Sequence, residues 1–183
     1  MHALVTYASR LGSTAEMAKR IAARLCDRGV EATVLPVEAT RTVATFDAVV
    51  IGSAIYAGHW LEGARHFVRE NEQDLLARPV WVFSSGPVGM SASREATAPG
   101  EVLDLVATIG ARDHRVFAGA FDATTVEDAE FPFIERVVAK RFVPQGDFRN
   151  WSQIDAWADD IAHAIIEAQP TRSKDAPVAG ALR

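Results

Sequence analysis

Hydroxyl side chains and a glycine cluster in the loop that follows the first apolar segment of the chain. They are Ser9, Gly12, Ser13 and Thr14. No acidic residue precedes Glu16, which lies inside the helical pattern that follows. The N-terminus of a helix carries a partial positive charge and unpaired backbone N–H groups, so it attracts an acidic side chain or a bound anion. Because this loop offers neutral donors and no acid, we predict that it binds the phosphate group of a ligand.

The kind of phosphate is limited by what the loop lacks. It has no GxxxxGK[ST] lysine, which excludes a P-loop for nucleoside triphosphates, and no GxGxxG, which argues against a dinucleotide. A hydroxyl-rich loop of this kind suits a monophosphate such as that of FMN.

Local capping of the helix is the alternative explanation of the same residues. Ser13 followed three positions later by Glu16 forms a capping box, which needs no ligand. The two interpretations are compatible if Ser13 caps the helix while Thr14 and the backbone point outward.

Two further loops carry residues suited to a flat ring. They are "GSAIYAGHW" (52–60) and "SSGPVGMSAS" (84–93), whose small residues let the backbone approach a ring closely. The first also offers the aromatic side chains of Tyr56, His59 and Trp60. Simpler explanations exist for all three: surface packing of Tyr56, an exposed turn at His59, and Trp60 as a core residue of the next helix.

Apolar runs alternate with helical patterns along most of the chain, which is typical of an α/β protein. Five strands are expected, at 2–8, 31–37, 47–55, 79–86 and 115–122. Helices are expected near 14–28, 62–77, 99–109 and 151–168. This order predicts a flavodoxin-like doubly wound five-stranded parallel sheet, with strand order 2-1-3-4-5 and an insertion before the last helix. The three loops would then meet at the carboxyl edge of the sheet, where such folds bind ligands.

Two connections depart from a regular fold. The segment 38–46 is too short for a full crossover helix. The insertion, about 123–150, contains an expected amphipathic helix with apolar residues on one side, namely Phe131, Ile134, Val138 and Phe142. These residues would form extra core, a lid beside the ligand, a homodimer contact or a membrane-facing patch. We favour the lid, because the last strand delivers the chain at the ligand-bearing edge.

The length and composition of the chain limit the number of domains and the classes of function that it could have. The 183 residues fit one domain at 1–168, followed by a tail at 169–183 that we expect to be mobile. A net charge of −5 provides no basic field for nucleic acid. With Cys26 as its single cysteine, the chain has no internal disulfide or cysteine-based zinc site, and no metal site is predicted. No apolar run approaches ~20 residues, so a cytoplasmic protein is expected.

Three segments together resemble one known family. They are "YASRLGSTAEMAKRIA" (7–22), "VVIGSAIYAGHWLEGARHFVREN" (49–71) and "NWSQIDAWADDIA" (150–162). They are similar to the flavodoxin-like protoporphyrinogen oxidase family, the quinone-linked protoporphyrinogen IX dehydrogenases. The resemblance covers roughly residues 2–168, including the insertion.

This resemblance implies an FMN-dependent oxidoreductase. Its substrate would be a small hydrophobic or porphyrin-like molecule, and its acceptor a quinone or another redox partner. The protein would be cytoplasmic, or peripheral to the inner face of the membrane through residues 123–150. The FMN phosphate would lie against Ser9, Arg10, Leu11, Gly12, Ser13 and Thr14. The flavin ring would lie between Ser53, Ala54, Ile55, Tyr56, Gly58 and His59 on one side and Ser84, Ser85, Gly86, Pro87, Val88 and Gly89 on the other.

Other functions stay open at this point. A non-enzymatic electron carrier would use the same cofactor, and a deazaflavin would fit the same fold. A protein-interaction module with an empty pocket would make the first loop a helix cap only. No independent catalytic machinery stands out, and the catalytic residue is unknown. His59 is a weak candidate for proton transfer, because histidine titrates near neutral pH.

Overall fold

Five long parallel strands form the predicted sheet. The computed structural model describes residues 1–86, 99–122, 124 and 144–168. The strands are β1 (His2–Ala8), β2 (Glu31–Pro36), β3 (Ala48–Tyr56), β5 (Val80–Ser85) and β6 (Asp113–Phe117). They pair in parallel in the order β2-β1-β3-β5-β6, and the short β4 (His59–Trp60) pairs antiparallel with the end of β3. Counted over the long strands, this order is the predicted 2-1-3-4-5.

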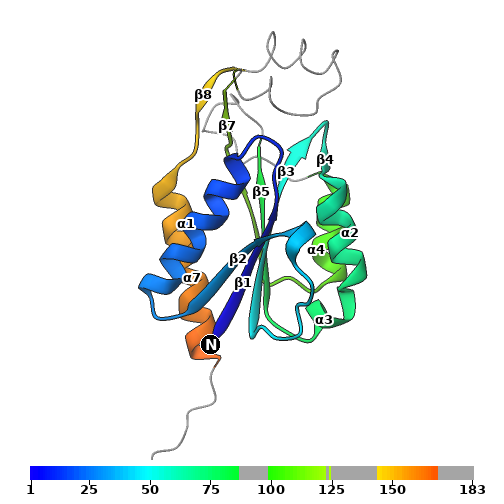
Figure 1. Ribbon diagram of the computed structural model, residues 1–183, viewed down its shortest axis with the longest axis vertical. Coiled ribbons are helices and arrows are strands. Elements are labelled where there is room, and N and C mark those ends of the chain that lie inside the picture. The colour runs from blue at the N-terminus through cyan, green and yellow to red at the C-terminus, as the bar shows by residue number, and fades with distance from the viewer. Residues whose placement is uncertain (87–98, 123, 125–143, 169–183) are drawn as a thin grey trace, which may run out of the picture.

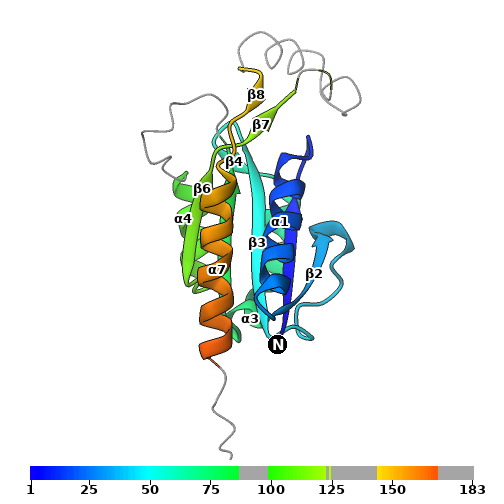
Figure 2. The ribbon, with the colours of Figure 1, turned by 90° about the vertical axis from the view of Figure 1, so that its left-hand side faces the viewer.

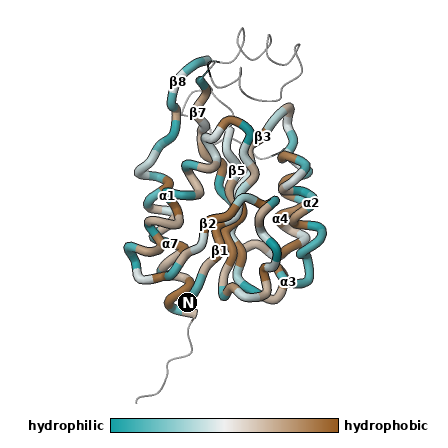
Figure 3. The backbone as a smooth tube through the Cα atoms, viewed as in Figure 1, coloured by the Kyte–Doolittle hydropathy of each residue, from teal (hydrophilic) through white to brown (hydrophobic). Residues whose placement is uncertain are grey.

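Helices cover both faces of the sheet (Figures 1 and 2). On one face lie α1 (Ser13–Asp27) and α7 (Trp151–Glu167), and on the other lie α2 (Glu62–Glu70), α3 (Glu72–Leu76) and α4 (Gly100–Thr108). Hydrophobic residues are concentrated along β1 and the strands beside it, as Figure 3 shows. The fold is therefore the predicted three-layer α/β arrangement.

The prediction of one continuous helix over 62–77 is wrong, because the segment forms two helices, α2 and α3. It is broken at Asn71, whose backbone leaves the helical region and whose side-chain amide donates to the carbonyl oxygen of Phe67 (2.9 Å). Asparagine competes for backbone hydrogen bonds in this way, which interrupts helices. The short connection at 38–46 is as predicted: a single 3₁₀ turn, η1 (Val37–Ala39), replaces a crossover helix.

The expected strand at 115–122 is also wrong in its extent. β6 begins earlier and ends at Phe117, and Ala120–Phe121 forms a separate strand, β7. β7 pairs antiparallel with β8 (Gly146–Asp147), so the two ends of the insertion lie side by side. The helix expected around Phe131–Phe142 and the tail at 169–183 lie outside the described residues.

A glycine makes room for the core beneath the carboxyl edge of the sheet. Gly52 on β3 lies beside Phe83 on β5, and a Cβ built at Gly52 would stand 2.1 Å from the Phe83 ring. The ring occupies that space and packs against Phe117 and Trp157, with centroids 6.3 and 6.1 Å away. The absent side chain at Gly52 thus makes room for the central aromatic cluster.

A ladder of ion pairs joins α1 to α7. Arg20 binds Asp155 through two hydrogen bonds of 2.7 and 2.6 Å. Arg24 and Arg28 both bind the carboxylate of Asp159, at 2.6 to 2.9 Å. The arginines hold the pKa of Asp155 and Asp159 below the ordinary value, mainly through these hydrogen bonds. The ladder connects the first and last helices of the domain.

The ion pairs of this ladder are expected to make the stability of the fold depend on pH. A carboxylate with a lowered pKa in the folded state stabilises the fold above its unfolded pKa, about 4, and loses that contribution as the pH falls below it. Asp159→Asn should therefore lower Tm by no more than about 2–4 °C at pH 6 and low salt. The difference from wild type should shrink as the pH falls below about 4 and vanish only in acid strong enough to protonate Asp159 in the folded protein.

Asp160→Asn is the matched control for this ladder. Asp160 is an exposed neighbour on α7, and none of the described ion pairs involves it. A Tm difference in Asp159→Asn that persists unchanged in strong acid would show that the carboxylate contributes no charge-dependent stability.

Candidate functional site

The loops expected to hold a ligand lie at one end of the sheet. The loop after β1, the β3–β4 hairpin and the end of β5 all lie at the carboxyl edge, at the top of Figure 1. β1 and β5 flank β3 on either side, so the three loops are neighbours. This is the edge at which doubly wound sheets bind ligands.

The first loop folds back on itself at the start of α1. The hydroxyl oxygen of Ser9 accepts a hydrogen bond from the N–H of Gly12 (3.1 Å). Gly12 is the N-cap residue, with φ +87°, a left-handed conformation that glycine adopts without strain. No side chain accepts a hydrogen bond from the first turn of α1 at this cap.

The predicted capping box is wrong. The Ser13 hydroxyl accepts a hydrogen bond from the N–H of Ala120 on β7 (3.0 Å) rather than from the helix. The Glu16 carboxylate is bound by Arg149 (2.6 Å), whose guanidinium also binds Asp147. Both residues have tertiary partners from the segment around β7 and β8, and these contacts replace the local cap.

The first loop therefore offers donors. The Ser9 and Ser13 oxygens each accept a backbone N–H, and each hydroxyl keeps its own hydrogen to donate. The expectation that Thr14 points outward is wrong, because it is 1% exposed. Thr14 shares the buried face of α1 with Met17 and Ala18, which pack on the sheet.

The second loop is a tight hairpin that presents Tyr56. Ala57 and Gly58 form its turn with φ of +49° and +82°, as two-residue hairpins require. Tyr56 is partly exposed, and the Arg10 guanidinium of the first loop lies over its ring, 5.6 Å from the centroid. Burial raises the pKa of the Tyr56 hydroxyl, and the charge of Arg10 opposes that shift. The first two loops are thus in contact.

His59 and Trp60, at the end of this hairpin, differ in their surroundings. The His59 side chain is 61% exposed and pairs with Glu101 on α4, which also binds Arg65 on α2 (2.6 Å). These two hydrogen bonds, that of His59 first, hold the pKa of the Glu101 carboxyl below its ordinary value. Trp60 is 2% exposed and belongs to the core, as one explanation of the sequence expected. It lies on β4, however, and not on the next helix.

The serines at the strand ends use their hydroxyls inside the protein. Ser53 donates to the carbonyl of Ala54 (3.1 Å) and accepts from the N–H of Leu61 (3.2 Å). Ser84 is fully buried, and Ser85 is 5% exposed. Of the three, Ser53 thus binds backbone groups, and Ser84 bonds to the side chains of Trp60 and His114.

The third loop is described only as far as Gly86. The N–H of Gly86 donates to the carbonyl of Phe117 (2.9 Å), and its φ is +121°. The remaining predicted positions, Pro87, Val88 and Gly89, lie outside the described residues.

Sequence reasoning missed three residues near this edge. Arg149 fixes the first turn of α1, Glu101 holds the hairpin, and His114 on β6 bonds to Ser84 (2.9 Å). Each acts on a residue 30 or more positions away in the chain, and no local pattern signals such a contact.

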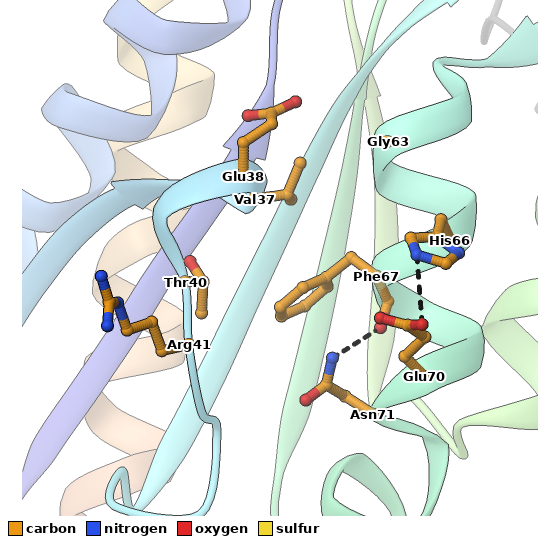
Figure 4. Close-up of a pocket in the computed structure, with 9 residues that line it drawn as sticks. All are labelled: Val37, Glu38, Thr40, Arg41, Gly63, His66, Phe67, Glu70 and Asn71. Atoms are coloured by element: carbon orange, nitrogen blue, oxygen red, sulfur yellow. Dashed lines mark hydrogen bonds and ion pairs between the residues drawn. The ribbon is translucent and has the colours of Figure 1, made fainter.

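The structure also has a hollow of about 600 Å³ away from this edge, between η1 and α2 (Figure 4). It lies beside the short 38–46 connection, which has a 3₁₀ turn next to α2 in place of a crossover helix. Its walls are Val37, Glu38, Thr40, Arg41, Gly63, His66, Phe67, Glu70 and Asn71. None of the predicted ligand-binding residues lines it.

Among the described residues, no group of His, Cys, Asp and Glu side chains could hold a metal ion. No helix in the described part of the chain has the length and apolar character needed to cross a membrane.

Comparison with known proteins identifies a domain family and a fold. A family model described as a flavodoxin domain matches residues 4–138. A flavodoxin from the domain Archaea is similar, with a TM-score of 0.57, 17% identity, and coverage of 91% of this chain and 99% of that one. Rubredoxin oxygen:oxidoreductase from Desulfovibrio gigas is similar with a TM-score of 0.59 and 16% identity. The match covers 91% of this chain and 36% of the length of that protein. Two-electron reduced Megasphaera elsdenii flavodoxin has a TM-score of 0.51 and 20% identity, over 63% of this chain and 85% of that one. No curated protein matches the chain.

Proposed function

Because the chain belongs to the flavodoxin domain family, we propose that it binds FMN at the carboxyl edge of β1, β3 and β5 and acts in electron transfer. One observation carries this proposal: α1 begins beneath the first loop at Gly12, and no side chain among the described residues caps the N–H groups of its first turn. A helix N-terminus of this kind favours a phosphate.

The donor set fits a flavin phosphate. The hydroxyls of Ser9 and Ser13 keep their hydrogens to donate, and the Gly12 conformation turns the chain into α1. The described residues of this loop include one charged side chain, that of Arg10, and it is positive. The charge and the donors therefore both favour a phosphate dianion.

Tyr56 supplies a surface for the ring. It is held by a two-residue hairpin whose far strand is anchored by buried Trp60. An aromatic side chain on a rigid hairpin can stack on a flat ligand with little loss of conformational freedom. When bound, FMN would supply two-electron redox chemistry, and the protein would orient it.

We propose, further, that the reaction is the oxidation of a porphyrinogen-like hydrophobic substrate with a quinone as acceptor. The resemblance of segments 7–22, 49–71 and 150–162 to the flavodoxin-like protoporphyrinogen oxidases supports this. The charges near the edge are also balanced: Glu101 pairs with His59 and Arg65, and Glu62 pairs with Arg65 and Arg69. A carrier that docks through charge complementarity would present an acidic face there instead.

Anaerobic turnover tests this proposal. FMN-loaded protein is mixed with protoporphyrinogen IX and a soluble quinone, and the fluorescence of the porphyrin product is followed. The expected result is many turnovers that require both FMN and quinone, with FMN-free protein as the control. Reduction of the flavin without turnover would identify an electron carrier. An absorbance spectrum of a deazaflavin in protein purified from its own source would show that the cofactor is a deazaflavin and not FMN.

Tyr56 is expected to quench the bound flavin. Stacking of the phenol on the ring should leave FMN weakly fluorescent in the wild type, and Tyr56→Ala should restore several-fold more emission per bound flavin. Tyr56→Trp keeps an aromatic ring and should remain quenched. Equal brightness in all three proteins, measured at saturating protein, would place the stacking partner elsewhere.

A further inference from the structure

A buried chain of hydrogen bonds joins two of the loops at the edge. The indole Nε1 of Trp60 donates to the hydroxyl oxygen of Ser84 (2.9 Å), and the same oxygen lies 2.9 Å from Nε2 of His114. Trp60 is 2% exposed and Ser84 is fully buried. Three side chains from β4, β5 and β6 thus form one chain across the sheet.

The position of this chain relates it to the proposed flavin site. Trp60 closes the hairpin that carries Tyr56, and Ser84 lies two residues before Gly86, where the third loop begins. His114 stands on the strand beyond, paired in register with Val82. The chain therefore joins the β3–β4 hairpin to the carboxyl end of β5, two segments proposed to lie beside the ring.

The direction of the chain depends on the tautomer of His114, and it runs from Trp60 through Ser84 to His114 when the neutral imidazole carries its proton on Nδ1. An indole N–H can only donate, so the Ser84 oxygen accepts from Trp60. The Ser84 hydroxyl hydrogen is then free to be donated to Nε2 of a neutral His114. A protonated imidazole has no acceptor and donates through Nε2, so the hydrogen of the buried Ser84 hydroxyl would lose its acceptor in this chain. A buried hydroxyl that loses its acceptor destabilises the arrangement.

We propose that neutral His114 is a positioning residue, which holds the β3–β4 hairpin against the carboxyl end of β5 through Ser84 and Trp60, so that protonation of His114 releases the flavin. This inference rests on the proposed FMN site. His114 does not touch the flavin in this account, since it acts through two other side chains.

The surroundings of His114 favour its neutral form. Burial lowers the pKa of its imidazole, and the neighbouring Asp113 opposes that shift. The Asp113 carboxylate is engaged by Trp157 (2.8 Å) and by Arg115 (2.9 Å). On the helix over this face, the charged residues of α4 are Glu101, which is held by His59 and Arg65, and the exposed Asp104.

The sign of the pH effect follows from this shift. When the pKa of a histidine is lower in the folded state than in the unfolded state, its protonation at acidic pH lowers the stability of the fold. Its neutral-state contribution is complete above its unfolded pKa, about 6.5, and is lost as the pH falls through its folded pKa. Flavin retention should weaken in the same window.

Nuclear magnetic resonance of the flavin-free protein tests the chain itself. The indole N–H resonance of Trp60, assigned by its loss in Trp60→Phe, and the ring C–H resonances of His114 are followed from pH 8 to pH 4. We expect both to titrate with one midpoint below about 6.5, and the indole to stay still in His114→Gln. An indole resonance of Trp60 that ignores the titration of His114 would overturn the coupling.

The FMN affinity tests the consequence. His114→Gln keeps a side-chain acceptor for Ser84 and does not titrate, so it should bind FMN within about twofold of wild type at pH 8. Below the His114 midpoint the wild type should lose affinity relative to His114→Gln by up to about tenfold for each pH unit. Protonation of the FMN phosphate affects both proteins equally and cancels in this ratio.

Failure of the inference and failure of the proposed function give different results. Parallel pH profiles in the two proteins would overturn the role of His114 while leaving the FMN site intact. Absence of FMN binding by the wild type at pH 8 would overturn the proposed function itself, whatever the resonances show.

Discussion

Replacing Gly12 by valine is expected to lower the affinity for FMN by roughly 10- to 100-fold. Gly12 has φ +87°, and a β-branched residue there strains the backbone by about 1–2 kcal/mol. Relief of that strain would turn the N–H groups at the start of α1 away from the phosphate. A lost hydrogen bond to a charged group costs about 1.5–3 kcal/mol, which corresponds to roughly this range. Titration of flavin-free protein with FMN measures it.

Gly29→Val is the matched control. Gly29 lies at the other end of α1 with φ +86°, and a Cβ at either glycine meets no atom within 4 Å. The two variants should therefore lose similar stability, while Gly29→Val keeps its FMN affinity. Riboflavin, which lacks the phosphate, should bind both variants as it binds the wild type. Equal FMN affinities in Gly12→Val and Gly29→Val would remove the first loop from the site.

Replacing Gly52 by alanine is expected to lower the free energy of unfolding by about 1–3 kcal/mol or more. The new Cβ would stand 2.1 Å from the Phe83 ring, which is fully buried and packed against Phe117 and Trp157. The ring cannot move without disturbing its neighbours, because protein cores are close-packed. Denaturant unfolding of wild type and variant measures the difference.

Gly63→Ala separates this clash from the general effect of removing a glycine. A Cβ at Gly63 in α2 would meet the carboxylate end of Glu38 at 2.9 Å, and this flexible side chain can move aside. Alanine is favoured over glycine in helices by about 0.5–1 kcal/mol. Gly63→Ala should thus be as stable as wild type or slightly more so. A Gly52→Ala protein of equal stability would show that the aromatic cluster tolerates a shift of the ring.

The parts of the fold that local patterns control were predictable. Continuously apolar strands alternating with amphipathic helices predicted the parallel sheet and its order, since both faces of such a sheet must be covered. Pairing of the chain ends around the insertion, at β7 and β8, was not predictable. Those strands are two residues long and carry no periodicity.

The candidate site was predictable in its place and less so in its contacts. Strand order alone brings the three loops to one edge, so Ser9, Tyr56 and Ser85 were expected to meet there. The capping box failed because Ser13 and Glu16 found partners on distant segments, and tertiary contacts override local motifs. The Ser84–His114 bond could not be foreseen, because it depends on the register of β5 and β6.

Titration of flavin-free wild-type protein with FMN and with riboflavin at pH 8 tests the central claim, that the carboxyl edge binds FMN through its phosphate. Quenching of flavin fluorescence reports the bound fraction for both ligands. We predict saturable binding of one FMN per chain and affinity for riboflavin at least about tenfold weaker, as loss of charge-assisted hydrogen bonds requires. Equal affinity for the two flavins, or no saturable binding of FMN, would contradict the account.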